Sequence, residues 1–565
     1  MKVDMTAPTG ALPARLDRRD PTRPRVLGYL VSLNGLHGVI ACQMTAEASA
    51  EHWSVGNLIS VVHESSRLVG VVCELMTSDQ RWNSEGVNLT LVKIELSGEV
   101  VDEAPGKPVF YRGVRSFPNL GAVAHRIRAE DLSAIYTIRG AEGAEIGSLT
   151  QNPSIVATVD ITELTKRHFA VVGSTGVGKT TAVSMLVKRC LRDRPDLRVL
   201  IVDPHNEYAS HFADDSLVLH SDNLELPYWM FRFDEILDII YGGRKTNPEE
   251  TEALYEVIRT AKARFGAGSA SRLSESVLRR PSQGDNGISA DTPVPYRVSD
   301  AAQIIEEWIG KLDGNYARAD LRSLKYRLEA LSQDPRYRFM FGKVLVDDVM
   351  AKVLGQIFRV PTAGKPVTIV QVAGLPNEVV NAVVSVLARM AFEIALASGG
   401  RYKIALLCEE AHRYLPADAS DAFAPTRRAL GRIAREGRKY GVSLGVVTQR
   451  PADVDATVLS QCSTMFAMRL GNDRDKAIVG AAAGVSSTGA LSFLSSLADR
   501  EAIAFGEAIA TPMRMKFGDY RQFERSQAAP DAGAEDAAAA ASSLRAIVAR
   551  MRGESSGEAP ALRSA

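Results

Sequence analysis

The feature that most constrains the fold of this chain is a glycine-rich segment that directly follows an apolar run. The segment reads Gly173-Ser-Thr-Gly-Val-Gly-Lys-Thr180, and it comes after His168-Phe-Ala-Val-Val172. The pattern G-x-x-x-x-G-K-[ST], placed between a buried strand and a helix, forms a loop whose backbone N–H groups cradle phosphates. We therefore expect a strand that ends near Val172, a helix that begins near Thr180, and an α/β nucleotide-binding core around them.

Two residues of this loop have distinct predicted roles. Lys179 would reach the β- and γ-phosphates, and the Thr180 hydroxyl would hold Mg²⁺, because a small hard cation prefers oxygen ligands. An ordinary glycine-rich turn is the alternative, and the strand and helix on either side disfavour it. The predicted nucleotide contacts of the loop are Gly173, Ser174, Thr175, Gly176, Val177, Gly178, Lys179, Thr180 and Thr181.

Composition limits the class of protein. The 565 residues contain 67 basic and 67 acidic side chains, so any DNA-binding surface must be local. The five cysteines are scattered, and an odd number argues against a disulfide framework. Residues 1–25 lack the apolar segment of a signal peptide. The longest apolar stretch, Val379 to Ala397, contains Arg389 and Glu393, which a membrane span disfavours. We expect a cytoplasmic protein without a membrane partner.

The chain divides into four predicted segments. Residues 1–25 are expected to be disordered, and residues 26–150 carry short β-branched runs typical of a small all-β barrel, followed by a linker. Residues 151–525 alternate strand and helix patterns, which predicts a parallel α/β sheet, interrupted at about 225–350 by amphipathic segments of an inserted helical subdomain. Residues 526–565 form a low-complexity tail, expected to be mostly disordered apart from a helical stretch at Leu544 to Met551.

Two carboxylates end a second buried strand. Lys403-Ile-Ala-Leu-Leu-Cys408 is followed by Glu409 and Glu410. We predict that Glu409 lies at the Mg²⁺ and that Glu410 deprotonates the attacking water. A solvated pair of glutamates at a helix start is the alternative.

A further pair of acids follows the strand that ends at Asp203. Asp203 and Glu207 belong to Asp203-Pro-His-Asn-Glu-Tyr208, and the carboxyl edge of an open α/β sheet is where ligands bind. Both acids are predicted to face the nucleotide. The alternative is a turn built by Asx-type hydrogen bonds around Pro204 and Asn206.

Basic residues gather between Thr426 and Arg450. Arg435 and Arg438 share a face near the end of a predicted helix that stops at Gly441, and an arginine so placed can project into a neighbour's nucleotide site. Gln449 ends the next strand and can sense the γ-phosphate through a hydrogen bond. Arg167, just before the first strand, is a further candidate phosphate contact, with a simple strand-edge charge as the alternative.

The motifs together resemble the HerA family, within the HerA/FtsK branch of P-loop ATPases. The similarity spans residues 26 to about 520 and includes Leu226-Pro-Tyr-Trp229, Arg435-Glu-Gly-Arg-Lys-Tyr-Gly441 and Thr448-Gln-Arg-Pro451. The family pattern commonly has Gly where this chain has Asn206, and Asn tolerates the same left-handed turn.

This resemblance implies a RecA-like P-loop core that hydrolyses ATP with Mg²⁺, preceded by a β-barrel used for assembly. It also implies a ring, expected to be a hexamer, which encircles double-stranded DNA, with an arginine in the Arg435 region acting in trans. Its members work as helicases or translocases in DNA repair with a partner nuclease, or in anti-phage defence with an effector. The alternatives are a nucleotide-gated scaffold ATPase of a defence complex and a DNA-pumping ATPase of the conjugation or segregation type.

Overall fold

The structure is a computed structural model of the whole chain. It describes residues 26–553 apart from short gaps. The gaps are 45–52, 79–81, 105, 139–142, 243–245, 274–287, 312–315, 343–346, 361–363, 419–423, 484–490, 492 and 524–536. The segment 1–25, for which the sequence predicts disorder, lies outside the described residues.

The N-terminal part is a closed β-barrel, as the sequence predicts. Its strands follow the order β2-β1-β7-β3-β4-β5, and β5 pairs back onto β2, so that six strands close the sheet while β6 extends from β5. Along β2, buried and more exposed residues alternate, because successive side chains of a strand point to opposite faces. The strands are β1 (Val26–Asn34), β2 (His37–Met44), β3 (Leu58–His63), β4 (Ser66–Thr77), β5 (Asn88–Ala104), β6 (Lys107–Arg112) and β7 (Val123–Arg126).

The central part is built on one large mixed sheet. Within the described residues it has eleven strands in the order β12-β13-β11-β14-β15-β10-β16-β17-β18-β8-β9. The pairs from β12 to β16 are parallel, and those from β16 to β9 are antiparallel. The strands are β8 (Ala144–Leu149), β9 (Val156–Val159), β10 (His168–Val172), β11 (Leu197–Asp203), β12 (Ser216–Leu219), β13 (Val367–Gln371), β14 (Lys403–Cys408), β15 (Val442–Thr448), β16 (Cys462–Ala467), β17 (Glu501–Gly506) and β18 (Met513–Phe517).

Helices cover both faces of this sheet, which explains why its parallel strands are mostly apolar. Ala170 and Val172 of β10 pack on the same side as α10 (Asn377–Ala397) and α11 (Ala424–Tyr440). Phe169 and Val171 of β10 pack on the opposite side, with α3 (Lys179–Asp193). A strand buried on both faces reads as a continuous hydrophobic run. The smaller helices of this part are α1 (Ala129–Tyr136), α2 (Ile161–Lys166), α12 (Ala456–Ser460) and α13 (Asp473–Ala483).

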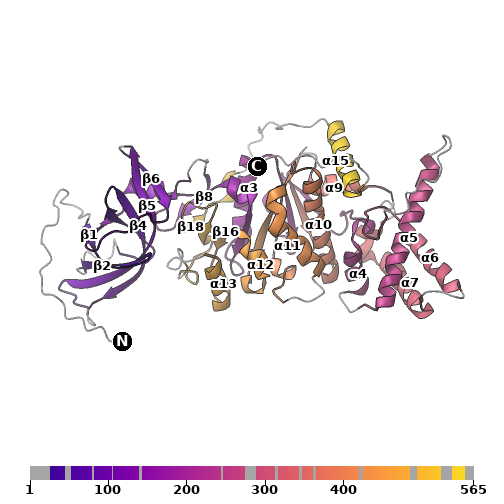
Figure 1. Cartoon of the computed structure of the whole chain (residues 1–565), viewed down its shortest axis with the longest axis horizontal. Helices are drawn as coiled ribbons and strands as arrows, with labels where there is room; N and C mark the ends of the chain where they lie inside the picture. The colour runs from indigo at the N-terminus through magenta and orange to yellow at the C-terminus, as the bar shows by residue number, and fades with distance from the viewer. Residues whose placement is uncertain are drawn as a thin grey trace.

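The chain leaves the sheet after β12 and forms the predicted helical insert before β13. Figure 1 shows the barrel at one end of the elongated molecule and α4 to α7 at the other, with the sheet between them. The helices are α4 (Phe233–Tyr241), α5 (Pro248–Leu273), α6 (Val298–Gly310), α7 (Arg318–Gln333), α8 (Arg338–Phe341) and α9 (Met350–Phe358).

Two boundaries differ from the sequence expectation. The central sheet already includes β8, whereas the sequence analysis placed the stretch before residue 151 in a linker. In the C-terminal tail, α15 (Ala537–Met551) packs against α9 and α10, with Leu544 and Ile547 buried (Figure 1). The predicted helical stretch Leu544 to Met551 is therefore the second half of a longer helix, and the burial of its apolar residues against the core offsets the entropy cost of ordering it.

One described helix, α10, is long and apolar enough by length and composition to cross a membrane, and 89% of its most apolar window is buried inside the molecule.

Candidate nucleotide site

The phosphate loop lies at the carboxyl end of β10 with the predicted geometry. Gly176 and Gly178 have φ angles of 78° and 99°, in the left-handed region that favours glycine. Gly173 lies so close to the neighbouring strand that an added Cβ would stand 2.7 Å from the Cβ of Met468. The helix α3 begins at Lys179, so the open N–H groups of its first turn face the loop. These features make an anion cradle that a larger side chain at Gly173 would distort.

Lys179 and Thr180 are held in place by oxygen partners. Lys179 is 7% exposed, and its Nζ donates to the carbonyl of Ser174 at 3.2 Å. The Thr180 hydroxyl donates to Glu207 Oε2 at 2.5 Å. Thr175 donates through its hydroxyl to Gln449 Oε1. Two predicted contacts from distant segments, Glu207 and Gln449, therefore already touch the loop.

The two glutamates after β14 lie at the same sheet edge, because β14 is parallel to β11 and β15, and β15 is parallel to β10. Glu409 is 3% exposed and accepts a hydrogen bond from the Tyr208 hydroxyl at 2.5 Å. Burial raises the pKa of Glu409 to about 7, and the nearby Lys179 and the Tyr208 hydrogen bond act in the opposite direction.

Glu410 is buried without full hydrogen bonding. It is 6% exposed, it has a φ angle of 50°, and its Oε2 has no hydrogen-bond partner. The Nδ1 of His412 lies 3.3 Å from this Oε2 and 3.1 Å from the Thr448 hydroxyl, and His205 Nε2 lies 4.0 Å from Oε1. Burial lowers the pKa of His412. Apart from the His412 nitrogen, no polar contact of Glu410 Oε2 is present within the described residues, so this oxygen keeps lone pairs available to a water proton.

Asp203 organises the turn that follows β11. Its carboxylate accepts backbone N–H bonds from His205 and Glu207 at 3.2 Å and from Tyr208 at 3.1 Å. Asn206 has a φ angle of 59°, the left-handed conformation expected at this position. This is the Asx-type turn that the sequence analysis left open as the alternative, and its effect is to aim Glu207 at Thr180. Direct nucleotide contact by Asp203 stays a prediction.

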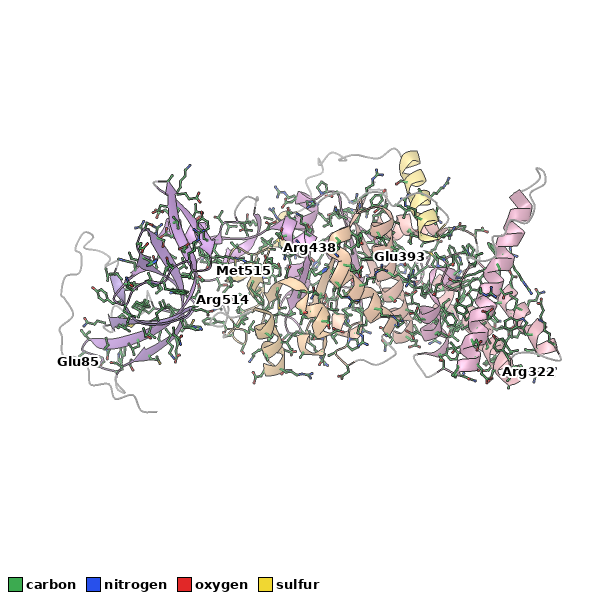
Figure 2. All side chains as sticks on the ribbon, viewed as in Figure 1. Glu85, Arg322, Glu393, Arg438, Arg514 and Met515 are labelled. Atoms are coloured by element: carbon green, nitrogen blue, oxygen red, sulfur yellow. The ribbon has the colours of Figure 1, made fainter. Side chains whose placement is uncertain are left out.

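The predicted arginines lie apart from the loop's phosphate side. Arg167 pairs with Glu163 at 3.0 Å, beside the start of β10. Arg435 and Arg438 are exposed on α11, and no ion pair of either is present among the residues that the structure describes. Figure 2 shows Arg438 over the central part of the molecule, between the barrel and the insert.

Sequence reasoning missed the roles of Tyr208 and His412. Both stand inside the motifs already singled out, but neither received a function. The signal for Tyr208 is weak, because an aromatic residue after a turn usually serves the core. Only the fold reveals that its hydroxyl reaches a carboxylate 201 positions away.

Comparison with known proteins places these features in a family. The family model "Helicase HerA, central domain" matches residues 144–391, which include the phosphate loop and the turn after β11. DNA double-strand break repair helicase HerA of Pyrococcus furiosus is 26% identical over 452 residues, covering 74% of this chain and 76% of that protein. The protein of the same name from Sulfurisphaera tokodaii is 24% identical, covering 82% of this chain and 88% of that protein.

Among solved structures, VirB4 of Thermoanaerobacter pseudethanolicus aligns with a TM-score of 0.49 and 15% identity, covering 69% of this chain and all of that chain. The match over residues 144–391 and the relatives at 24–26% identity support a HerA-family P-loop ATPase, an enzyme that hydrolyses ATP.

Proposed function

We propose that this protein is a ring-forming translocase or helicase that uses ATP hydrolysis to move on double-stranded DNA in DNA processing. The names of the similar proteins, which are repair helicases, support the DNA substrate. The observation that supports a ring-shaped oligomer is the position of Arg435 and Arg438 relative to the phosphate loop.

These arginines lie near the edge of the sheet opposite the loop. In the parallel pair of β10 and β15, Val172 faces Thr448, so Thr448 marks the loop's edge. The helix α11 ends at Tyr440, immediately before β15 begins at Val442. The seven residues of extended strand from Val442 to Thr448 span about 20 Å. Neither arginine contacts its own phosphate loop among the described residues, and both are exposed, so we propose that they act on the loop of an adjacent subunit.

Within one subunit, we propose the following division of roles. Lys179 and the loop amides hold the phosphates. When nucleotide binds, Gln449 gives up its hydrogen bond with Thr175 and contacts the γ-phosphate instead. Glu410 takes the proton of the attacking water through its unpaired Oε2. Arg435 of the neighbouring subunit stabilises charge on the transferred phosphoryl group, with Arg438 as a second contact.

The oxygen donors at the loop fit a bound Mg²⁺. The Thr180 hydroxyl and the Glu207 carboxylate lie together, and Glu409 is held by Tyr208 at the same edge. Mg²⁺ commonly uses one or two such protein oxygens together with substrate phosphates and waters, and when bound it neutralises charge on the β- and γ-oxygens. Tyr208 orients Glu409, and Glu207 keeps the Thr180 hydroxyl turned toward this position.

A subunit-mixing experiment tests the shared site. Glu410→Gln and Arg435→Ala are each expected to abolish hydrolysis, since one lacks the base and the other lacks the finger. If the finger acts in trans, mixing the two inactive proteins creates interfaces with an intact Glu410 and an intact Arg435, so duplex-stimulated ATPase activity returns in part. No recovery after subunit exchange, or a monomer that ignores DNA when imaged with an ATP analogue, would overturn the proposal.

A further inference from the structure

The turn that enters β17 packs against the phosphate loop from a distant part of the chain. The backbone N–H of Arg500 donates to the carbonyl of Val177 at 2.8 Å, and the carbonyl of Arg500 accepts from the N–H of Phe517 at 2.9 Å. The side-chain stem of Arg500 covers Gly178, because a Cβ added at this glycine would stand 3.0 Å from the Arg500 Cγ. Arg500 therefore contacts the loop through both its backbone and its side chain.

The backbone of Arg500 is strained. Its φ angle is 64°, in the left-handed region where L-residues are disfavoured. Glycine would adopt the same conformation and make the same backbone bonds without that cost. Strained residues of this kind cluster at functional sites, where the surrounding structure enforces them. Because glycine could make the same backbone contacts without strain, these contacts do not account for an arginine at position 500. Its side chain therefore needs a role of its own.

The surrounding turn is rigidly built. Glu501 is 6% exposed, and its carboxylate accepts from the N–H of Ala498 at 3.0 Å and from the Arg514 guanidinium at 2.8 Å. Figure 2 shows Arg514 on the side of the core that faces the barrel. A charged hydrogen bond between the buried Glu501 and the partly buried Arg514 fixes the turn just after Arg500.

A second arginine ties the same turn to the start of the loop. The guanidinium of Arg469 donates to the carbonyl of Leu497 at 3.2 Å and pairs with Asp499 at 2.9 Å. The carbonyl of Arg469 accepts from the N–H of Ser174 at 2.9 Å. The turn is therefore connected to both ends of the phosphate loop, and Arg500 is presented from a preorganised frame.

The charge of Arg500 has no partner, unlike the charges of its neighbours. Arg469 and Arg514 each face an acid, whereas Arg500 is exposed, and the structure shows no ion pair or hydrogen bond of its side chain within the described residues. The loop amides cradle the α- and β-phosphates, while Lys179 reaches the β- and γ-phosphates. Gly178 belongs to this loop, so Arg500 lies beside amides that are expected to cradle the α- and β-phosphates.

We infer that Arg500 is a nucleotide-binding residue of its own subunit whose guanidinium contacts the α- or β-phosphate of the bound nucleotide. Guanidinium groups bind phosphate oxygens through paired, charge-assisted hydrogen bonds. The inference requires only nucleotide binding, so it stands independently of DNA movement and of the trans arginine.

Calorimetric titration of the full chain with ADP and with a non-hydrolysable ATP analogue tests this contact. Arg500→Ala and Arg500→Gly should each weaken both ligands to a similar degree, by roughly tenfold. Arg500→Lys should keep part of the affinity, because it retains the charge but loses the paired geometry. Arg322→Ala removes an exposed arginine at the far end of the insert (Figure 2) and should bind as the unaltered chain does.

The glycine variant separates the side chain from the backbone. It relieves the strain at φ 64° while it removes the guanidinium, so it remains informative even if the alanine variant fails to fold. Wild-type affinity of Arg500→Gly for both ligands would overturn the inference, since Arg500 would then serve only to support the loop. A loss confined to the ATP analogue would also overturn it, because the contact would then lie at the γ-phosphate.

Discussion

Glu235 in the helical insert and Glu410 after β14 are both buried carboxylates, but they differ in how completely they are hydrogen bonded. Both oxygens of Glu235 are hydrogen bonded: Oε1 to Ser385 and to Arg389 Nε, and Oε2 to the Arg232 N–H and a terminal Arg389 nitrogen, at 2.7–3.2 Å. Glu410 is nearly as buried, yet its Oε2 accepts no hydrogen bond and has His412 Nδ1 as its neighbour at 3.3 Å.

The difference in hydrogen bonding fits a structural role for Glu235 and the proposed catalytic role for Glu410. A buried ion pair whose hydrogen bonds are complete fixes the packing of α4 against α10, and removing one partner leaves the other unpaired in the interior. A buried carboxylate with a free oxygen costs stability, and such costs are tolerated where a reacting group must bind. Burial alone therefore does not identify a functional acid, and the proposed role of Glu410 rests on its incomplete hydrogen bonding together with its position at the sheet edge that carries the phosphate loop.

The largest contrast is expected in stability. Glu235→Gln should lower the free energy of unfolding by about 3–5 kcal/mol, because it leaves the Arg389 charge without its partner in the interior. Glu410→Gln should leave that free energy unchanged or slightly higher, because it removes an unsatisfied charge. Denaturant unfolding of both variants measures these free energies. Equal destabilisation by the two substitutions would contradict the difference in role between Glu235 and Glu410.

Replacing both Glu235 and Arg389 tests whether this ion pair stabilises the fold by more than charge balance. In the double variant Glu235→Leu with Arg389→Met, neither charge remains buried, so roughly half or more of the loss from the single variant should be recovered. The same unfolding measurement applies. A double variant as unstable as the sum of the two single variants would show that the pair contributes more than charge balance.

The pH dependence of stability tests the neighbouring carboxyl of Glu409. Its folded-state pKa of about 7 lies above the value of about 4.3 for an unfolded chain, so the native state binds this proton more tightly. The resulting stabilisation is complete below about pH 4 and is lost as the pH rises through about 7. Compared with Glu409→Gln, the unaltered chain should therefore lose stability across this window, by on the order of 3 kcal/mol.

Glu85→Gln is the control for this pH series, because Glu85 is exposed on the barrel (Figure 2). It should follow the pH profile of the unaltered chain. A profile for Glu409→Gln that runs parallel to the unaltered chain between pH 4 and 7 would contradict the raised pKa.

The smallest expected effect concerns His412, which contacts Glu410 and Thr448 together. His412→Asn should lower kcat by roughly tenfold through misplacement of the base, with little change in ATP affinity, because the histidine positions Glu410 and does not hold the nucleotide. Steady-state kinetics separate the two quantities. A change in KM with an unaltered kcat would assign His412 to nucleotide binding instead.

Much of the site's frame could be predicted from the sequence. The phosphate loop and the acids after β14 are local patterns, and parallel strands bring their carboxyl ends to one edge. The closed barrel followed from short strands separated by turns. These features depend on residues close together in the chain, so a single sequence reveals them.

The remaining features depend on contacts between distant segments. The bond from Tyr208 to Glu409, the pairing of Glu207 with Thr180 and the packing of Arg500 on Gly178 arise only once the sheet order is known. The docking of α15 on α9 and α10 likewise depends on a complementary apolar surface, and composition alone does not show that surface.

The most direct test of the central claim is ATP turnover by Glu410→Gln, with ATP affinity measured on the same preparation in the presence and absence of duplex DNA. The unpaired Oε2 of Glu410 predicts unchanged ATP binding and a fall in kcat of roughly 10²–10⁴-fold under both conditions. Hydrolysis at the rate of the unaltered chain, with or without DNA, would contradict the assignment of Glu410 as the base of ATP hydrolysis.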